Sequence, residues 1–343
     1  NGGRNLQKSG PGSLMKVRAG LAASLVALSI LTTPTASAAT NICIAYDIGG
    51  PGDRSFNDAT LAGVKKAQSQ YTFTFEGVVT DGTAADRQKR LRSLTTKSCA
   101  TIIAVGAEYA KIIEPLALEF PSTQFAIIGD ASIAALNVTS VIFADVEGAF
   151  LAGYSAAISS KSGKVAMITT PSSADTYQNG FLAGVVASKK NVRSFVKYTA
   201  TDLATTTKAM VSMGIDVIYL ATSGSGDGAF DAIVKANTAK NRKKNAVDAN
   251  LILTEPDLYL SVTSATSKYL LASVVKRVDI AVADVIGKAV NNSQLSDVLD
   301  AKAGIYGHRY TIADKGIEIV IKSKVLAAQA AAINTAASAA YAR

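Results

Sequence analysis

Apolar runs typical of buried parallel strands alternate along this chain with segments of helical periodicity. The first run, 42–46, precedes a polar loop and then a segment over 58–67 whose apolar residues have helical spacing. Later apolar runs each precede a polar or glycine-rich turn, at 73–79, 101–105, 125–128, 165–168, 194–198, 217–220 and 251–253. This alternation predicts an α/β fold in which parallel sheets are covered by helices on both faces.

The length of the chain favours more than one such sheet. With 343 residues and 48% hydrophobic composition it can bury a large core, most simply as two lobes. We expect the chain to cross between the lobes near Asp145, Thr254 and Ala301. The predicted N-terminal lobe then comprises 39–145 and 254–300, and the C-terminal lobe 146–253 and 301–343. The alanine-rich tail over 326–342 predicts a terminal helix, with a frayed end as the alternative.

The first 38 residues have a different character. The basic stretch Met15-Lys-Val-Arg18 precedes an apolar segment over 19–31 and the small residues Ala36-Ser37-Ala38. This pattern is typical of a secretory signal peptide, with cleavage predicted after Ala38. The apolar segment is shorter than the ~20 residues that span a bilayer. We therefore expect an exported, soluble mature protein, and we place residues 1–38 outside the fold.

The charge of the chain is basic but dispersed. The formal net charge is +9, of which the first 38 residues contribute four cations and no acids. The one basic run along the sequence, Lys240-Asn-Arg-Lys-Lys244, has no interleaved aromatic residues. Such a run is typical of a solvated helix end, so we expect no nucleic-acid partner.

The chain has two cysteines, Cys43 and Cys99, and each lies in or next to a predicted strand. A disulfide between them in an oxidising compartment and two buried free thiols are both compatible with the sequence. No cluster of cysteine and histidine has metal-ligand spacing, so we predict no metal site and no cofactor.

The loop that follows the first predicted strand concentrates chemically useful groups. Residues 46–58 contain several glycines, carboxylates, Asn57 and the aromatic Phe56. In open α/β sheets, ligands bind at the carboxyl ends of the strands, where free N–H groups converge. Phe56 therefore either stacks on a ligand or covers its own core.

The pattern Asp47-Ile-Gly-Gly-x-x-Asp53-x-Ser55-Phe56-Asn57 resembles the signature of the basic membrane protein family. Further motifs extend the resemblance in the right order, at 143–154, 180–184 and 273–279. The resemblance implies the two-lobed type I periplasmic-binding-protein fold and an extracytoplasmic, purine-nucleoside-binding protein that feeds an ABC transporter permease. Family members carry a lipid-modified cysteine after a Leu-Ala-Gly-like triplet, whereas Cys43 follows Thr40-Asn41-Ile42. The resemblance therefore does not extend to a lipid anchor.

Nucleoside binding requires aromatic platforms for the base and acceptors for the ribose hydroxyls. Phe56 is one candidate platform, with Asn57 beside it as a hydrogen-bonding group. Tyr177 occupies a position where relatives carry Phe and is the candidate for the facing platform, with a surface tyrosine as the alternative. Phe181, four residues later, also belongs to this segment, although we favour core packing for it.

The resemblance also implies a set of polar ligand groups. Asp130 resembles a ribose-binding Asp, although Gly129 separates it from the preceding strand. Glu255 and Asp257 stand where the family has Asp-x-Asp-Gln, with Leu258 in place of the amide.

Asp47 either holds its loop or reaches the ligand. Lys276 matches a family lysine and is expected to pair with Asp47 or Glu255 or to donate to the ligand, with a solvated helix lysine as the alternative. The glycines of the turn, Gly224, Gly226 and Gly228, would let the backbone approach the ligand.

Enzymatic chemistry finds little support in the sequence. The chain has one histidine, His308, so Ser225 in its glycine-rich turn has no evident triad, and the Walker lysine is missing. We predict a monomeric solute-binding protein that takes up a nucleoside, with a purine nucleoside favoured. The alternatives are a nucleoside-sensing regulator of the same fold, or a binding protein for a pyrimidine nucleoside, a free base or a sugar.

Overall fold

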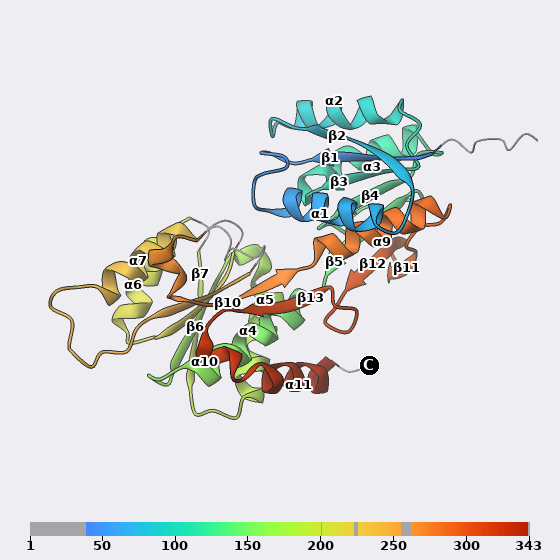
Figure 1. The fold of residues 1–343 in the computed structure, drawn as a ribbon. Coiled ribbons are helices and arrows are strands. Elements are labelled where there is room, and N and C mark those ends of the chain that lie inside the picture. Colours follow the sequence, from blue (N-terminus) through green and yellow to red (C-terminus); the bar gives the residue numbers. More distant parts are fainter. Residues whose placement is uncertain (1–38, 200, 223–225, 255–261, 342–343) are drawn as a thin grey trace, which may run out of the picture. The chain divides into compact units, whose positions relative to one another are not determined.

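The computed structural model describes residues 39–199, 201–222, 226–254 and 262–341. The predicted signal peptide lies outside this range. Two β-sheets, each flanked by helices, form the described fold (Figure 1). The expected α/β architecture of two mainly parallel sheets is confirmed.

The first sheet has seven strands in the order β11-β12-β5-β4-β3-β1-β2. All neighbours pair in parallel except β11 and β12. Helices α1 and α9 cover one face, and α2 and α3 cover the other. The strands are β1 (Thr40–Tyr46), β2 (Phe73–Val79), β3 (Thr101–Val105), β4 (Phe125–Ile128), β5 (Val138–Phe143), β11 (Asp297–Asp300) and β12 (Ile305–Tyr310). The helices are α1 (Phe56–Gln68), α2 (Ala84–Thr95), the 3-10 turn η1 (Ala107–Tyr109), α3 (Ala110–Glu119) and α9 (Val278–Val290).

The second sheet has six strands in the order β13-β10-β9-β8-β6-β7, and only β13 runs antiparallel to its neighbour. Helices α4, α5 and α11 cover one face, and α6 and α7 cover the other. The strands are β6 (Lys164–Thr169), β7 (Arg193–Tyr198), β8 (Val217–Ala221), β9 (Asn250–Thr254), β10 (Leu270–Lys276) and β13 (Ile317–Ile321). The helices are α4 (Asp145–Ser159), α5 (Ala174–Ala187), α6 (Leu203–Ser212), α7 (Asp227–Asn237) and α11 (Ala330–Tyr341), with short turns η2 (Pro171–Ser173), α8 (Ser264–Ser267) and α10 (Lys324–Ala327).

Glycines allow helices α4 and α5 to approach each other closely. A Cβ atom at Gly153 would lie 2.0 Å from the carbonyl oxygen of Phe181, and one at Gly184 would lie 2.1 Å from that of Phe150. Both distances are far below van der Waals contact, so any larger residue would force the helices apart. These family-motif glycines therefore serve helix packing.

The sheet topology corrects two of the three predicted crossovers. The first, from β5 into α4, falls near Asp145 as expected. Strand β10 pairs in parallel with β9, so the chain leaves the second sheet after Lys276 and not near Thr254. Strand β12 pairs with β5 and β13 with β10, so the third crossover lies between Tyr310 and Ile317 and not near Ala301. The polar residues within β12 and the isolated serine within β10 weakened the strand pattern at both places.

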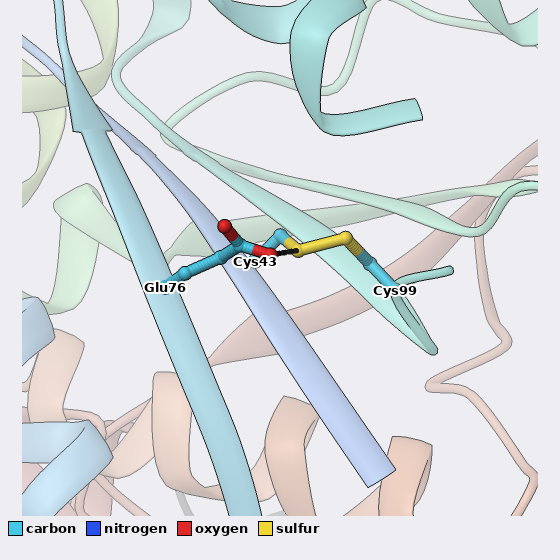
Figure 2. Close-up of side chains that lie close together, drawn as sticks. All are labelled: Cys43, Glu76 and Cys99. Carbon is cyan, nitrogen blue, oxygen red and sulfur yellow. Dashed lines mark hydrogen bonds between the residues drawn. A yellow bond between two sulfur atoms is a disulfide. The ribbon is translucent and has the colours of Figure 1, made fainter. Parts of the chain in front are cut away.

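Cys43 and Cys99 form a disulfide, with a distance of 5.8 Å between their Cα atoms (Figure 2). The bond joins the middle of β1 to the turn before β3, and its two cysteines are 56 positions apart in the sequence. Glu76 of β2 lies beside the two sulfurs. Because thiolates, not disulfide sulfurs, are metal ligands, this group is a covalent staple and not a metal site. The alternative of two free thiols is wrong.

Removing this disulfide should destabilise the first lobe. A bond that closes a loop of this length contributes about 4 kcal/mol in the chain-entropy model. We expect the Cys43→Ala, Cys99→Ser double variant to lose about 2 to 5 kcal/mol of unfolding free energy in a urea titration. Wild-type protein kept in dithiothreitol is the matched control and should unfold at the same urea concentration as the variant. Equal stability of oxidised wild type and double variant would contradict the role of the bond.

Candidate functional site

The loop between β1 and α1 is held by Asn57. This side chain is 2% exposed. Its Nδ2 donates to the carbonyl oxygen of Ile48 at 3.1 Å and to Oδ2 of Asp53 at 2.7 Å, and its Oδ1 accepts from the N–H of Asp47 at 3.0 Å. Both amide hydrogens are thus used within the loop. Asn57 therefore positions the loop, and a ligand contact by this side chain stays a prediction.

Three glycines and the carboxylate of Asp58 complete the shape of this loop. Gly49, Gly50 and Gly52 have φ values of +86°, +59° and +104°, a region that disfavours other residues. Asp58 accepts from the N–H groups of Gly52 and Arg54 at 2.6 and 2.9 Å. The loop is therefore fixed by its own hydrogen bonds before any ligand arrives.

A buried arginine on helix α2 orients the side chain of Asp47. Arg87 of α2 is 7% exposed, and its Nε and Nη2 donate to Oδ1 of Asp47 at 3.2 and 2.7 Å. Its Nη1 donates to the carbonyl oxygen of Gly82 at 2.6 Å, and the guanidinium lies over the ring of Tyr109. Sequence reasoning missed Arg87. The available signal was weak: Arg87 stands four residues before the buried Leu91, on the inward face of α2.

The carboxyl ends of β1, β3 and β4 gather the first-lobe ligand candidates. Gly106 follows β3, and a Cβ atom there would lie 3.4 Å from Oδ2 of Asp47. Asp130 follows β4 and is partly exposed, with its Oδ1 accepting from the N–H and hydroxyl of Ser132 at 2.7 and 2.6 Å. Phe56 begins α1 and is partly buried against the core. Asp47 and Asp130 thus lie at the same edge of the sheet.

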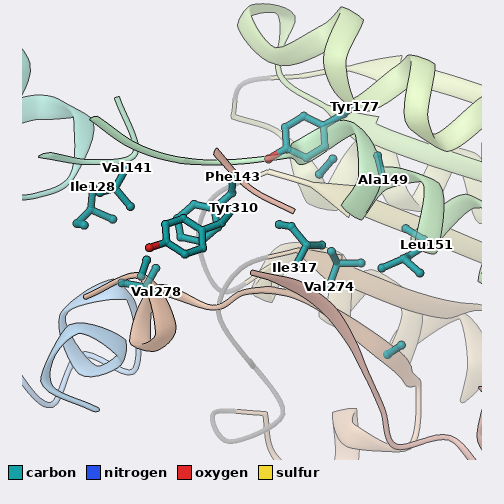
Figure 3. Packing of buried hydrophobic residues seen from close by; sticks show 14 of the residues in the cluster. Ile128, Val141, Phe143, Ala149, Leu151, Tyr177, Val274, Val278, Tyr310 and Ile317 are labelled. Carbon is teal, nitrogen blue, oxygen red and sulfur yellow. The ribbon is translucent and has the colours of Figure 1, made fainter. Parts of the chain in front are cut away.

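In the second lobe, Tyr177 and Phe181 have different environments. Phe181 is fully buried and stacks on Tyr219, with 6.0 Å between ring centroids. It packs in the core, so its inclusion among the ligand residues is not supported. Tyr177 is 7% exposed and lies among the buried side chains of Figure 3. The alternative of a surface tyrosine is therefore wrong, while a ligand contact by its ring stays a prediction.

Lys276 forms an ion pair with Asp145, with 2.9 Å between Nζ and Oδ1. Its side chain is 12% exposed, so it is not a solvated helix lysine. Lys276 ends β10 and Asp145 begins α4, so the pair joins the first and second crossovers. Asp47, one of the two expected partners, is bound by Arg87, and Glu255, the other, lies outside the described residues.

Tyr219 lies beside this ion pair and was not recognised in the sequence. Burial raises the pKa of its hydroxyl well above the usual value, and the charge of Asp145 acts in the same direction. The hydroxyl therefore stays protonated at any physiological pH. It is held in the interior close to Tyr177, Lys276 and Thr254.

The remaining predicted ligand groups are only partly within the described residues. Gly226 is buried at the start of α7 with φ +69°, and a Cβ atom there would lie 3.2 Å from the side chain of Leu220. Gly228 lies in the first turn of α7. Gly224, Glu255 and Asp257 lie outside the described residues.

Two cavities adjoin the Lys276–Asp145 pair. One of about 680 Å³ is lined by Asp145, Thr176 and Arg309 among others. Another of about 380 Å³ is lined by Lys276, Ser55 and Asp58 among others. Asp47, Phe56, Asp130 and Tyr177 line neither cavity.

His308 is a structural residue at the third crossover. Its Nδ1 bonds to Asp297 of β11, and its Nε2 lies 3.0 Å from Oδ2 of Asp314. Asp314 also accepts from the N–H groups of Thr311 and Gly316 at 2.7 and 3.1 Å. Partial burial lowers the pKa of His308, but the two carboxylates outweigh it and the net shift is upward.

Two mainly parallel sheets, each flanked by helices and joined by three crossovers, form the type I periplasmic-binding-protein fold. The family described as "ABC transporter substrate-binding protein PnrA-like", or Bmp, matches residues 42–336. The chain belongs to this family. It is a substrate-binding protein and not an enzyme.

Relatives of known name agree with this assignment. The chain is 31% identical over 270 residues to the CD4+ T-cell-stimulating antigen of Listeria monocytogenes, covering 72% of this chain and 73% of that protein. It is 27% identical to the "ABC transporter nucleoside-binding protein BmpA" of Lactococcus lactis, covering 71% and 73%. It is 30% identical to basic membrane protein A1 of Borrelia garinii, covering 52% and 56%.

Solved structures share the fold at low sequence identity. An ABC transporter solute-binding protein from Aeropyrum pernix has a TM-score of 0.61 at 19% identity, covering 88% of this chain and 85% of that one. The arabinose-binding protein AraP of Geobacillus stearothermophilus has a TM-score of 0.61 at 15% identity, covering 84% and 98%. Within the described residues, no helix is both long and apolar enough to cross a membrane.

Replacing Arg87 by methionine should leave Asp47 without its bound cation. Breaking a buried ion pair costs about 3 to 5 kcal/mol, and we expect about 3 because Asp47 is 30% exposed. Urea unfolding measures the loss. Arg90→Met on the same helix is the control, since the Arg90 side chain is 44% exposed in its ion pair with Asp86 and the variant should lose less than about 1 kcal/mol. Equal losses in both variants would contradict the structural role of Arg87.

His308 should make stability depend on pH. Because its pKa is raised in the folded protein, the charged imidazole stabilises the fold fully below pH ~6.5, the unfolded value, and this contribution is lost as pH rises through the folded value. Unfolding free energies of wild type and His308→Gln are compared at pH 5.5 and pH 9. The wild-type advantage should be larger at pH 5.5. An advantage that grows toward pH 9 would show that the carboxylates do not hold the charged form.

Proposed function

We propose that this protein binds a purine nucleoside at the carboxyl ends of its two sheets and delivers it to an ABC transporter permease. The observation that carries the proposal is the orientation of Asp47. Arg87 holds Oδ1, whereas Oδ2 has no hydrogen-bond partner among the described residues and is directed toward Gly106. A carboxylate fixed in this way can accept a ribose hydroxyl without paying further ordering entropy.

Other groups at the same edge support a nucleoside. Asp130 offers a second carboxylate, and Phe56 offers an aromatic face at the start of α1. Base stacking on an aromatic side chain contributes ~1 to 3 kcal/mol. The similarity to the nucleoside-binding protein of Lactococcus lactis agrees with this ligand class.

The second lobe supplies the opposing groups in this proposal. Tyr177 of α5, Tyr219 of β8 and Lys276, the last residue of β10, lie close together. A ligand that contacts both sheets would favour the closed arrangement of the lobes, because closure adds its second set of contacts. The protein works outside the cytoplasm as a monomer, and no bond of the ligand is broken.

A different ligand is the second candidate. Gly129 sets Asp130 one residue further from β4 than in relatives, and Glu255 and Leu258 replace an Asp and an amide of the family pattern. These changes make a pyrimidine nucleoside, a free base or a sugar the next candidate ligand after a purine nucleoside. A nucleoside-sensing regulator would use the same groups but a different partner.

Calorimetric titration tests both candidates. The chain from Ala39 to Arg343, refolded to remove carried-over ligand, is titrated with adenosine, guanosine, inosine, cytidine, uridine and ribose. We expect saturable binding of the purine nucleosides. Asp47→Asn should weaken it about 10- to 100-fold, the equivalent of a charge-assisted hydrogen bond of about 1.5 to 3 kcal/mol.

The controls separate the ligand site from the fold. Phe56→Ala should also weaken binding, whereas Glu114→Gln, an exposed change on α3, should not. A response to ribose alone, or to none of the six compounds, would overturn the nucleoside proposal.

A further inference from the structure

The amino ends of four parallel strands in the second sheet form one edge. Strands β9, β8, β6 and β7 are neighbours in that order, with Lys164 opposite Arg193, Val165 opposite Val217 and Val217 opposite Asn250. The segments leading into them therefore emerge side by side. We call these segments, residues 160–164, 188–193, 213–216 and 238–249, the basic edge.

The basic edge concentrates the positive charge of the protein. It holds nine Lys and Arg residues and two acids. The remainder of the chain after residue 38 has 22 Lys and Arg residues and 24 Asp and Glu residues. The excess positive charge of the mature protein thus lies at this edge, although the sequence divides it among separate short segments.

The two acids, Asp216 and Asp248, compensate only a small part of the positive charge of the basic edge. Asp216 is 4% exposed and accepts from the hydroxyls of Ser160 and Ser162 at 2.6 and 2.8 Å. It serves the turn before β6. Asp248 pairs with Arg242 at 2.7 Å, so one of the nine cations is compensated by an ion pair.

Six lysines of the basic edge are exposed and form no ion pair among the described residues. Three come from the turns before β6 and β7, and three from the segment before β9: Lys161, Lys189, Lys190, Lys240, Lys243 and Lys244. A cluster of exposed positive charges of this kind creates a positive electrostatic potential that attracts anionic surfaces.

Apolar side chains stand within the same edge. Met213 is 49% exposed and Val247 is 42% exposed. Beside Met213, a cavity of about 370 Å³ is lined by Phe195, Met210 and Ile215 among others. A soluble polyanion would gain nothing from these groups, whereas a lipid surface offers an apolar boundary just below its headgroups.

We propose that the basic edge docks on an anionic lipid surface, with the lysines at the headgroups and Met213 and Val247 reaching the acyl boundary. Each cation near such a surface adds to the attraction, so several together hold a protein of this size at the surface. The ligand groups remain accessible, because strands of about six residues, or ~20 Å, separate the basic edge from the carboxyl ends.

Vesicle co-sedimentation tests the proposal. The chain from Ala39 to Arg343 is mixed with vesicles of phosphatidylcholine containing phosphatidylglycerol and with vesicles of phosphatidylcholine alone. Binding should require phosphatidylglycerol and should be lost in high salt, since screening shortens the reach of the charges. The variant with Lys189, Lys190, Lys243 and Lys244 changed to glutamine should bind at least about tenfold more weakly.

The matched control carries the same loss of charge elsewhere. Lys89, Lys111, Lys288 and Lys302 are exposed residues of the first lobe, and changing all four to glutamine should weaken binding less than about threefold. Unchanged urea unfolding of both variants shows that the fold is intact. Equal weakening in the two variants would reduce the effect to net charge and overturn the proposal.

The apolar groups distinguish a lipid surface from a soluble polyanion. Met213→Ser together with Val247→Ser should weaken vesicle binding while leaving retention on a column of immobilised polyphosphate unchanged. Wild-type protein that binds polyphosphate but not the anionic vesicles would overturn the assignment to lipid. Nucleoside titration of the same variants reports separately on the ligand site.

Discussion

The ion pair between Lys276 and Asp145 lies where the two lobes are joined. It connects the last residue of β10 to the first residue of α4, and so links the points where the chain leaves each sheet. The side chains of Lys276 and Asp145 are 12% and 27% exposed, so the pair compensates two charges that are largely withdrawn from water. Tyr177 and the buried Tyr219 lie beside it. The proposed ligand groups of the second lobe therefore lie beside the ion pair that joins the crossovers.

In the first lobe, a buried guanidinium group holds the candidate ligand residue Asp47 in place. Arg87 binds Asp47, the carbonyl of Gly82 and the face of Tyr109, while Asn57 closes the loop above. The covalent bond between Cys43 and Cys99 holds the middle of β1. The strand that leads into Asp47 is thus fixed at its middle and at its carboxyl end. A binding protein benefits from such preorganisation, because a rigid acceptor loses little entropy when the ligand arrives.

The two ends of the second sheet serve different purposes in our proposals. Polar and aromatic groups gather at the carboxyl ends, where backbone N–H groups are available to a ligand. Lysines gather at the amino ends, where the connecting segments are free to carry charge without disturbing the core. Parallel strands impose this separation, since every strand places its two ends at opposite edges of the sheet.

Local patterns determined the alternation of strands and helices, and β2, β3 and β4 begin and end where the apolar runs predicted. They also identified the loop after β1, because positions with positive φ favour glycine and the glycines are visible in the sequence. Tertiary structure alone decided that Arg87 binds Asp47 across 40 residues, that Lys276 pairs with Asp145, and that the two cysteines are joined. It also placed β10 and β12 in their sheets and assembled the basic edge. These features depend on segments far apart in the chain, and residue periodicity carries no information about which of them meet.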